Sequence, residues 1–215
     1  MKVKPVREIR RTERGEQRRQ ALMEAARQVF LEQGYEGASI EEVMRRVGGS
    51  KASLYSYFGS KEGLFFDILT AQSEQFMKDL RIPDSADDDL EKTLHAVGKR
   101  FLNMILDPDR SKLFRIMLGE AQRFPELAQR FFERGPQRSK RAMAEYLRLQ
   151  HKAGRLDCPD SEHATAQFFE LIKGQPHLRM MLNQPTFPPG MNAERHVAAA
   201  VKLFLYGCSR TPHKK

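Results

Sequence analysis

One stretch, residues 39–61, constrains the fold of this chain more than any other. It reads SIEEVMRRVGGSKASLYSYFGSK. Its first apolar residues recur at i, i+3, i+4 and i+7, the spacing that lines one face of an α-helix. Ser39, followed three residues later by Glu42, is a capping-box signal for a helix start. The pair Gly48-Gly49 favours a helix end, because glycine tolerates a left-handed backbone. We therefore expect a short helix that begins at Ser39 and ends at this glycine pair.

A second short helix is expected directly after the glycine pair. Ser50 can cap its start and Gly59 can end it. Leu54 and Phe58 lie four residues apart, so both face inward against the first helix. Two short helices joined by a glycine turn form a helix-turn-helix, whose second helix lies in the major groove of DNA. The stretch therefore predicts a DNA-reading motif, and two packed helices with no such role are the alternative.

The outward positions of this stretch carry the side chains that such a role needs. Lys51, Tyr55 and Lys61 can donate hydrogen bonds, and the methyl group of Ala52 can touch a thymine methyl. We assign Lys51 to a base contact, and Tyr55 and Lys61 to phosphates. The complete set of candidate DNA-binding residues is Ser39, Arg46, Ser50, Lys51, Ala52, Ser53, Tyr55, Tyr57 and Lys61.

The same residues resemble the DNA-binding module of the tetracycline-repressor (TetR) family. The family pattern runs G-V-S-[small or Lys]-x-[Ser/Thr]-L-Y-x-[Tyr/His]-F-x-[Ser/Asn]-K-[Glu]-x-L, and residues 48–64 read GGSKASLYSYFGSKEGL. Gly49 departs from the pattern, since the family usually has an apolar residue there. Residues 21–43 are similar to the family's first helix and loop, and residues 119–174 more loosely resemble the C-terminal domain of one large group of these regulators. The resemblance implies an N-terminal DNA-binding domain, a helical ligand-binding and dimerisation domain, and control of transcription by a small molecule.

Positive charge is concentrated at the start of the chain. The formal net charge is +9, and residues 1–19 hold eight Lys or Arg against three Glu. A basic arm beside a DNA-reading helix can bind phosphates or enter the minor groove; a solvated tail is the alternative. We expect residues 1–15 to form a mobile basic arm, residues 16–61 the helix-turn-helix domain, and residues 62–215 the ligand-binding and dimerisation domain.

The rest of the chain shows helical periodicity and no two-residue period of a strand, which predicts an all-α fold of about nine helices. Asp107-Pro108 is expected to end the fifth helix, and Gly174 with Pro176 the eighth. The acidic run Asp84, Asp87, Asp88 and Asp89 favours a helix cap over a metal site, because it lacks the glycine and closing glutamate of a calcium loop. Besides the two short helices of residues 39–58, helices are expected over residues 16–33, 61–80, 90–106, 111–123, 160–173 and 192–208. A further helical stretch is expected over residues 126–134, and after a break at Gly135-Pro136 it continues to about residue 153.

Two further sites follow from this helical arrangement and from the resemblance. An apolar or aromatic effector is expected within the helices between residues 90 and 173, with plain core packing as the alternative for each wall residue. The candidate walls are Phe101, Met104, Met117, Phe131, Met143, Tyr146 and Phe168. The last two helices are expected to form a four-helix dimer bundle, the family's usual arrangement. Its candidate contacts are Phe168, Leu171, Val197, Val201, Phe204 and Leu205.

Several classes of function have no support in the sequence. The zinc-protease, phosphate-loop, nucleophile-elbow and dinucleotide motifs are missing, so we expect no enzyme, no cofactor and no metal site. The chain shows no apolar run near the ~18 residues of a membrane span and no secretory signal. Cys158 and Cys208 make neither a disulfide framework nor a zinc pattern, which favours a reducing cytoplasm. We therefore expect a cytoplasmic, ligand-responsive repressor that binds a palindromic operator as a homodimer. The alternative is a non-specific or architectural nucleic-acid-binding protein without a ligand.

Overall fold

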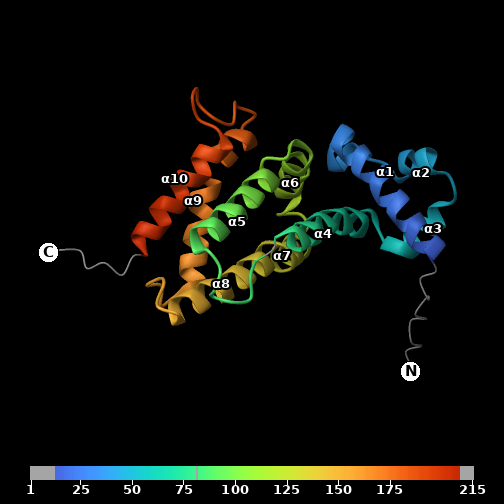
Figure 1. Ribbon diagram of the computed structural model, residues 1–215. Coiled ribbons are helices and arrows are strands. Elements are labelled where there is room, and N and C mark those ends of the chain that lie inside the picture. Colours follow the sequence, from blue (N-terminus) through green and yellow to red (C-terminus); the bar gives the residue numbers. More distant parts are fainter. Residues whose placement is uncertain (1–12, 81, 209–215) are drawn as a thin grey trace. The chain divides into compact units, whose positions relative to one another are not determined.

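The computed structural model describes residues 13–80 and 82–208, with the backbone alone for residues 77–79. Every regular element in this part of the chain is an α-helix (Figure 1), which confirms the predicted all-α class. The described residues form ten helices where about nine were expected, because the two pieces on either side of the predicted break at Gly135-Pro136 are separate helices, α7 and α8. The helices are α1 Glu13–Gly37, α2 Ile40–Val47, α3 Lys51–Phe58, α4 Lys61–Asp79, α5 Leu90–Ile105, α6 Pro108–Glu120, α7 Pro125–Arg134, α8 Pro136–Lys152, α9 Ser161–Met181 and α10 Ala193–Gly207.

The chain divides into two compact units, residues 1–68 and 69–215, so that the break falls within α4. Of the expected basic arm, residues 13–15 belong to α1, and the remainder lies outside the described residues. No described helix combines the length and the apolar character that crossing a membrane requires.

The N-terminal unit is built on a core to which α1, α2, α3 and the start of α4 all contribute. Leu22 and Phe30 of α1, Leu54 of α3 and Leu64 of α4 are almost completely buried. Full burial of one such side chain contributes about 1.5–3 kcal/mol. The caps predicted for the two short helices are present: the Ser39 hydroxyl accepts a hydrogen bond from the backbone N–H of Glu42 at 3.2 Å. The core and the caps together fix the orientation of α3 within this unit.

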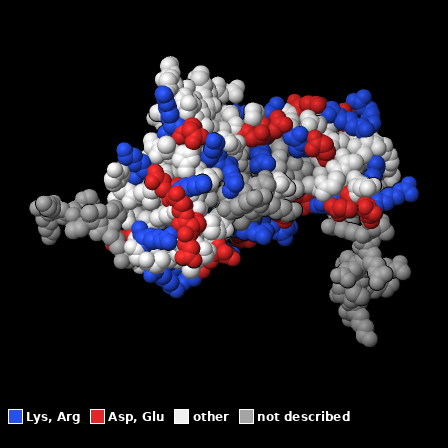
Figure 2. All heavy atoms as spheres, viewed as in Figure 1, with Lys and Arg blue, Asp and Glu red and all other residues white. Residues whose placement is uncertain are grey.

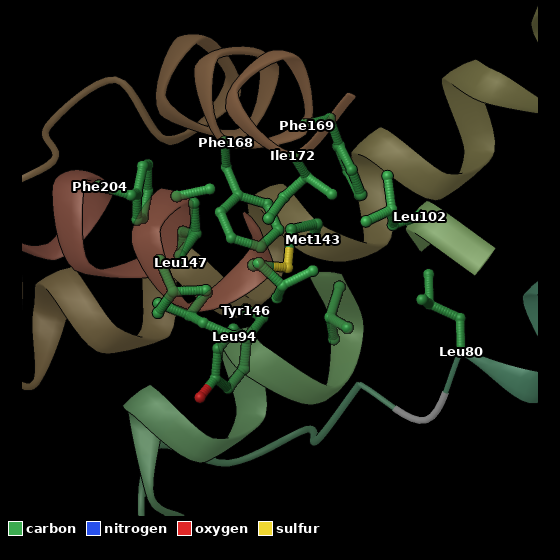
Figure 3. Packing of buried hydrophobic residues seen from close by; sticks show 14 of the residues in the cluster. Leu80, Leu94, Leu102, Met143, Tyr146, Leu147, Phe168, Phe169, Ile172 and Phe204 are labelled. Atoms are coloured by element: carbon green, nitrogen blue, oxygen red, sulfur yellow. The ribbon is translucent and has the colours of Figure 1, made fainter. Parts of the chain in front are cut away.

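The C-terminal unit is centred on α5, α8, α9 and α10, which pack on one another. Figure 3 shows side chains from these helices pointing into a shared apolar interior. Phe168 of α9 lies at its centre, with ring contacts to Phe169 at 5.5 Å and to Phe204 of α10 at 5.2 Å between centroids. Gly98 of α5 allows the close approach of α9 and α10, because a Cβ there would lie 2.8 Å from Ile172 Cδ1. This packing leaves α6 and α7 to the side of the core.

The start of α6 differs from the sequence expectation. The dipeptide Asp107-Pro108 was expected to end one helix, with the next beginning near Ser111, but α6 already begins at Pro108. The Asp107 carboxylate accepts a hydrogen bond from the Arg110 backbone N–H at 2.9 Å. Proline suits the first turn of a helix, where its missing N–H has no acceptor to lose. Asp-Pro therefore works here as a start signal as well as a stop signal.

Helix α9 also continues beyond its expected end. Gly174 has a non-helical backbone (φ 38°, ψ −148°), yet the chain resumes a helix and runs to Met181 with Pro176 inside it. Pro176 lies in the first turn after this kink, where a proline is tolerated. The first helical segment of α9 thus ends at Gly174, where it was expected to end, but the second segment that runs on to Met181 was not predicted.

The acidic run before α5 caps that helix, as expected. The Asp89 carboxylate accepts a hydrogen bond from the Lys92 backbone N–H at 3.1 Å. Its neighbour Asp88 accepts hydrogen bonds from the Tyr146 hydroxyl at 3.0 Å and from the Gln150 amide at 3.4 Å. Among the described residues, no cluster of His, Cys, Asp and Glu has a geometry that could hold a metal ion. The run is thus a cap that is also tied to α8.

Candidate DNA-binding surface and ligand cavity

Helix α3 presents a polar face outward and an apolar face inward. Leu54 and Phe58 are buried, whereas Lys51 and Ala52 are exposed. The Tyr55 side chain is 45% exposed, so its hydroxyl can be reached from outside the unit. A short helix with this arrangement can place its first two turns against the edges of base pairs.

Three other residues of the predicted contact set are partly engaged within the unit. The Ser50 hydroxyl accepts a hydrogen bond from the Ser53 backbone N–H at 3.2 Å, so it caps α3. Tyr57 is half-buried, with its ring centroid 6.0 Å from that of Phe58. Lys61 is half-buried, and its ammonium lies 4.6 Å from the centroid of the Tyr35 ring. These contacts orient α3 and the start of α4, whereas Lys51, Ala52 and Tyr55 lie on the exposed side of α3.

The cations on α2 and α3 are paired with carboxylates. Arg46 contacts Glu32 at 2.5 Å and Glu42 at 2.9 Å, and these hydrogen bonds raise the pKa of its guanidinium. Lys51 pairs with Glu41, which raises the pKa of the lysine and lowers that of the glutamate. Exposed pairs of this kind contribute little to stability, with a median of about 0–1 kcal/mol. A DNA phosphate can therefore replace the carboxylates at small cost.

The distribution of surface charge agrees with these pairs. Figure 2 shows Lys and Arg interleaved with Asp and Glu over the face in view, rather than one continuous basic surface. Binding that depends only on phosphate charge needs a dense array of unpaired cations. The described residues seen in this view do not form such an array.

Sequence reasoning missed the role of Arg18, which it counted only as part of the positive charge of residues 1–19. The Arg18 guanidinium donates hydrogen bonds to the carbonyl oxygen of Val47, at 3.1 Å, and to that of Gly48. Both glycines of the turn have positive φ, 75° at Gly48 and 92° at Gly49. A Cβ added to Gly49 would lie 2.4 Å from Arg18 Nη2. The guanidinium thus occupies the space of the apolar side chain that the TetR pattern has at this position.

The signal for this contact was present in the sequence. Arg18 precedes Leu22 by four residues, so both lie on the same face of α1, and Leu22 is fully buried. Arg18 is a charged residue on the inward face of α1, and Gly49 stands where a larger residue is usual. The two together indicate that the Arg18 side chain fills the space that Gly49 leaves.

A cavity of about 450 Å³ lies in the C-terminal unit. Its volume falls within the range of about 300–1,000 Å³ that small-molecule sites occupy. Four of the seven predicted wall residues line it: Phe101, Met104, Met117 and Phe131. Further lining residues that sequence reasoning did not name are Leu69, Gln72, Ser73, Phe76, Ile105, Arg110, Ser111, Phe114, Leu118, Ala121, Ala128, Phe132, Gly135, Pro136, Ser139, Lys140, Phe169, Glu170, Lys173 and His177.

The other three predicted wall residues do not line this cavity. Met143, Tyr146 and Phe168 belong to the packed core and point into it (Figure 3), with at most 1% of each residue exposed. Burial raises the pKa of Tyr146 to about 12. Helical periodicity identified their inward face correctly, but it does not distinguish a packed interior from the wall of a cavity. In this structure the three act as core.

The polar groups around the cavity are mostly cationic. Arg110, Lys140 and Lys173 are lining residues, whereas Glu170 is the one carboxylate among the residues that line it. Lys173 contacts both carboxylate oxygens of Glu170 at 3.1 Å. Burial, with the Lys173 ammonium acting in the same direction, lowers the pKa of His177, so its imidazole is neutral at neutral pH.

The predicted dimer contacts need a correction. Phe168, Val197, Val201 and Phe204 are buried within the core of a single chain, and Leu171 and Leu205 are half-buried. The main apolar stripe of an amphipathic helix faces its own core, and sequence reasoning selected that stripe. Other apolar residues of this part of the chain are exposed, in α9 and α10 and at Leu182 directly after α9. The large ones among them are Leu178, Leu182, Leu203 and Tyr206.

Comparison with known proteins places these features in a family. Residues 22–68 match the family described as bacterial regulatory proteins, tetR family, and residues 92–207 match the C-terminal domain of AefR-like transcriptional repressors. The solved structure of the flavonoid-responsive regulator FrrA is 31% identical, with a TM-score of 0.77; the match covers 92% of this chain and 100% of that one.

Shorter matches relate the chain to both a repressor and an activator of transcription. Over 51 residues it is 44% identical to the HTH-type transcriptional repressor AcnR of Corynebacterium diphtheriae, covering 24% of this chain and 27% of AcnR. Over 90 residues it is 32% identical to the HTH-type transcriptional activator FasR of Mycolicibacterium smegmatis, covering 42% of this chain and 41% of FasR. These proteins are regulators of transcription and not enzymes. The chain belongs to the TetR family of bacterial transcriptional regulators.

Proposed function

We propose that this chain is a ligand-responsive repressor. In this proposal it binds a palindromic operator as a homodimer and leaves it when a flat, largely apolar compound fills the cavity of the C-terminal unit. The observation that carries the proposal is the outward polar face of α3, with Tyr55 45% exposed and Leu54 and Phe58 buried behind it. The cavity of about 450 Å³ supports the ligand response. Because its proposed target is DNA, we expect the protein to act in the cytoplasm.

DNA binding and ligand binding belong, in this proposal, to different parts of the chain. We propose that residues 16–61 bind DNA and that residues 62–215 bind the ligand and a second copy of the chain. One α3 helix offers too few contacts for tight specific binding, so two copies must read half-sites about 34–36 Å apart. Ligand binding lowers operator affinity if the ligand-bound conformation holds the two α3 helices at another spacing. The size of this effect is set by how much more tightly the ligand binds that conformation than the operator-binding one.

The decisive experiment is a selection of bound DNA from a random pool, followed by binding measurements on the selected sequence. We expect an inverted repeat, and an affinity for it at least ~10³-fold above that for random duplex at the same salt concentration. A steep salt slope without sequence preference would instead identify a general nucleic-acid binder. Loss of operator affinity on addition of flat aromatic compounds tests the ligand response.

Activation of transcription is the competing candidate to repression, because the chain resembles an activator as well as a repressor over part of its length. A reporter gene behind the selected operator separates the two. We expect expression to rise when the regulator is deleted, whereas an activator would give a fall.

A further inference from the structure

The interior of the cavity is lined by aromatic rings. Six phenylalanines contribute, and several lie in edge or tilted contact with one another. The ring centroids of Phe101 and Phe169 are 4.6 Å apart at 61°, and those of Phe114 and Phe131 are 6.1 Å apart at 41°. Aromatic rings prefer offset or edge contacts with other rings. A flat ring system therefore suits this interior better than a flexible aliphatic chain does.

The side chains that line the cavity carry more positive than negative charge. Lys173 and Glu170 compensate each other. Arg110 and Lys140 also line the cavity, both half-buried, and neither side chain pairs with a carboxylate in the described part of the chain. Two cations thus remain beside an apolar space of low dielectric, where a charge acts more strongly than in water.

These two cations favour a carboxylate ligand over a neutral one. A neutral apolar compound that fills the cavity takes water away from Arg110 and Lys140 and offers nothing in return, which costs free energy. A carboxylate supplies the missing partner through charge-assisted hydrogen bonds, which are about twice as strong as neutral ones. The His177 imidazole, whose centroid is 6.0 Å from that of Phe114, adds a neutral group to the same wall.

We propose that the effector is an aromatic carboxylic acid, with its rings among the phenylalanines and its carboxylate at Arg110 and Lys140. This inference rests on the proposed function and deepens it, because it names the chemical class that the cavity selects. It distinguishes an aromatic acid from a neutral phenol of the same size.

The test uses pairs of aromatic probes that share a ring system, one with a charged carboxylate and one with a neutral polar group. Benzoate, 2-naphthoate and biphenyl-4-carboxylate are each compared with the corresponding neutral alcohol, in which a CH₂OH group replaces the carboxylate. Binding to the full chain is measured by calorimetry at pH 7.5. For the pair of best-fitting size, we expect the acid to bind at least ~10-fold more tightly than the alcohol.

A charge-matched pair of variants tests the assigned residues. Arg110→Gln combined with Lys140→Gln is expected to weaken binding of the acid by ~10-fold or more and to change binding of the alcohol by less than about 2-fold. The control is Lys112→Gln combined with Arg141→Gln, because these exposed residues on the same two helices do not line the cavity. This control is expected to leave both affinities unchanged. Circular dichroism shows whether each variant folds.

Failure of this inference differs from failure of the proposed function. If the alcohols bind as tightly as the acids and release the operator, the effector is neutral; the inference is then wrong and the repressor proposal stands. Equal loss of acid and alcohol binding in the Arg110/Lys140 variant would also overturn the inference. If no probe of either kind binds or alters operator affinity, the inference and the proposed ligand response both fail.

Discussion

At the residue scale, the turn between α2 and α3 depends on a contact between Arg18 and the backbone. Its guanidinium binds the Val47 carbonyl oxygen at 3.1 Å and also that of Gly48, so it satisfies two acceptors at the end of α2. Such carbonyls have no partner inside their own helix. Arg18 is therefore a positioning residue for the recognition helix, and it acts without needing to touch DNA itself.

A double-mutant cycle tests this role. Arg18→Ala is expected to cost about 1 kcal/mol of stability, because a partly exposed charge-assisted hydrogen bond is lost, and to weaken operator binding. Gly49→Ala in the parent chain meets both a positive φ and the Arg18 side chain, and should cost about 1–3 kcal/mol. In the Arg18→Ala background that cost should fall by at least about 0.5 kcal/mol, measured by urea unfolding. Strict additivity would show that Arg18 does not occupy the space beside Gly49.

Lys51 and Tyr55 carry different predicted roles on the open face of α3. Lys51→Ala should relax base choice at one operator position, with about 1–3 kcal/mol of discrimination lost if it contacts a guanine. Tyr55→Ala should weaken binding to all sequences alike, because a phosphate contact carries no sequence information. Competition among operators with single base changes measures both effects. A uniform loss for Lys51→Ala would contradict its assignment to a base.

At the element scale, helix ends that carry local signals were predicted well, and the helical segment that follows the kink in α9 was not. Serine caps and glycine stops gave α2 and α3 correctly, since capping depends on a few neighbouring residues. Gly174 and Pro176 interrupt α9 as their local signals predict, yet the chain resumes a helix directly beyond the kink. The reason lies elsewhere in the chain: Pro176 has no N–H for the Ile172 carbonyl, and His196 Nε2 of α10 hydrogen-bonds that carbonyl at 2.8 Å. No local pattern contains this tertiary contact.

The hydrogen bond from His196 should stabilise the kink in α9. Because a carbonyl oxygen only accepts, Nε2 carries the proton. Replacing His196 by Ala leaves the Ile172 carbonyl without that donor, at an expected cost of about 1–3 kcal/mol in the free energy of unfolding. His163→Ala is the matched control on exposed α9 surface and should change stability by less than about 0.5 kcal/mol. Thermal unfolding of the two variants gives the comparison, and similar effects would show that the bond contributes nothing specific.

At the scale of the whole molecule, the class of fold followed from periodicity, whereas the division of inward residues into core, cavity wall and interface did not. A helix pattern shows which side is apolar but not what that side meets. Phe101 lines a cavity and Phe168 fills the core, although both occupy inward positions on neighbouring helices. Cys158 and Cys208 lie 50 residues apart in sequence, yet both belong to or pack on one core, where burial raises the pKa of Cys158 to about 11. Three-dimensional packing alone decides such roles.

The proposed dimer should therefore depend on the outward face of α9 and α10, not on the residues first assigned to it. Leu203 is 60% exposed and Tyr206 is 66% exposed, beside the exposed small residues Ala198 and Ala199. Small side chains allow helices to approach closely, and we propose that a second copy of the chain covers these exposed apolar side chains. Leu203→Glu combined with Tyr206→Glu places two charges in each copy of that surface.

We expect this double variant to remain folded and to become a monomer, with the dissociation constant of the dimer raised at least ~100-fold. Analytical ultracentrifugation at micromolar concentration measures the change, and operator affinity should fall with it. Arg141→Glu on exposed α8 is the control and should leave the dimer intact. Val201→Asp, on the buried side of α10, should instead unfold the C-terminal unit, because it places a charge in the core. If the double variant stays dimeric, another face must join the two copies, since the α10 surface would then contribute too little to hold them together.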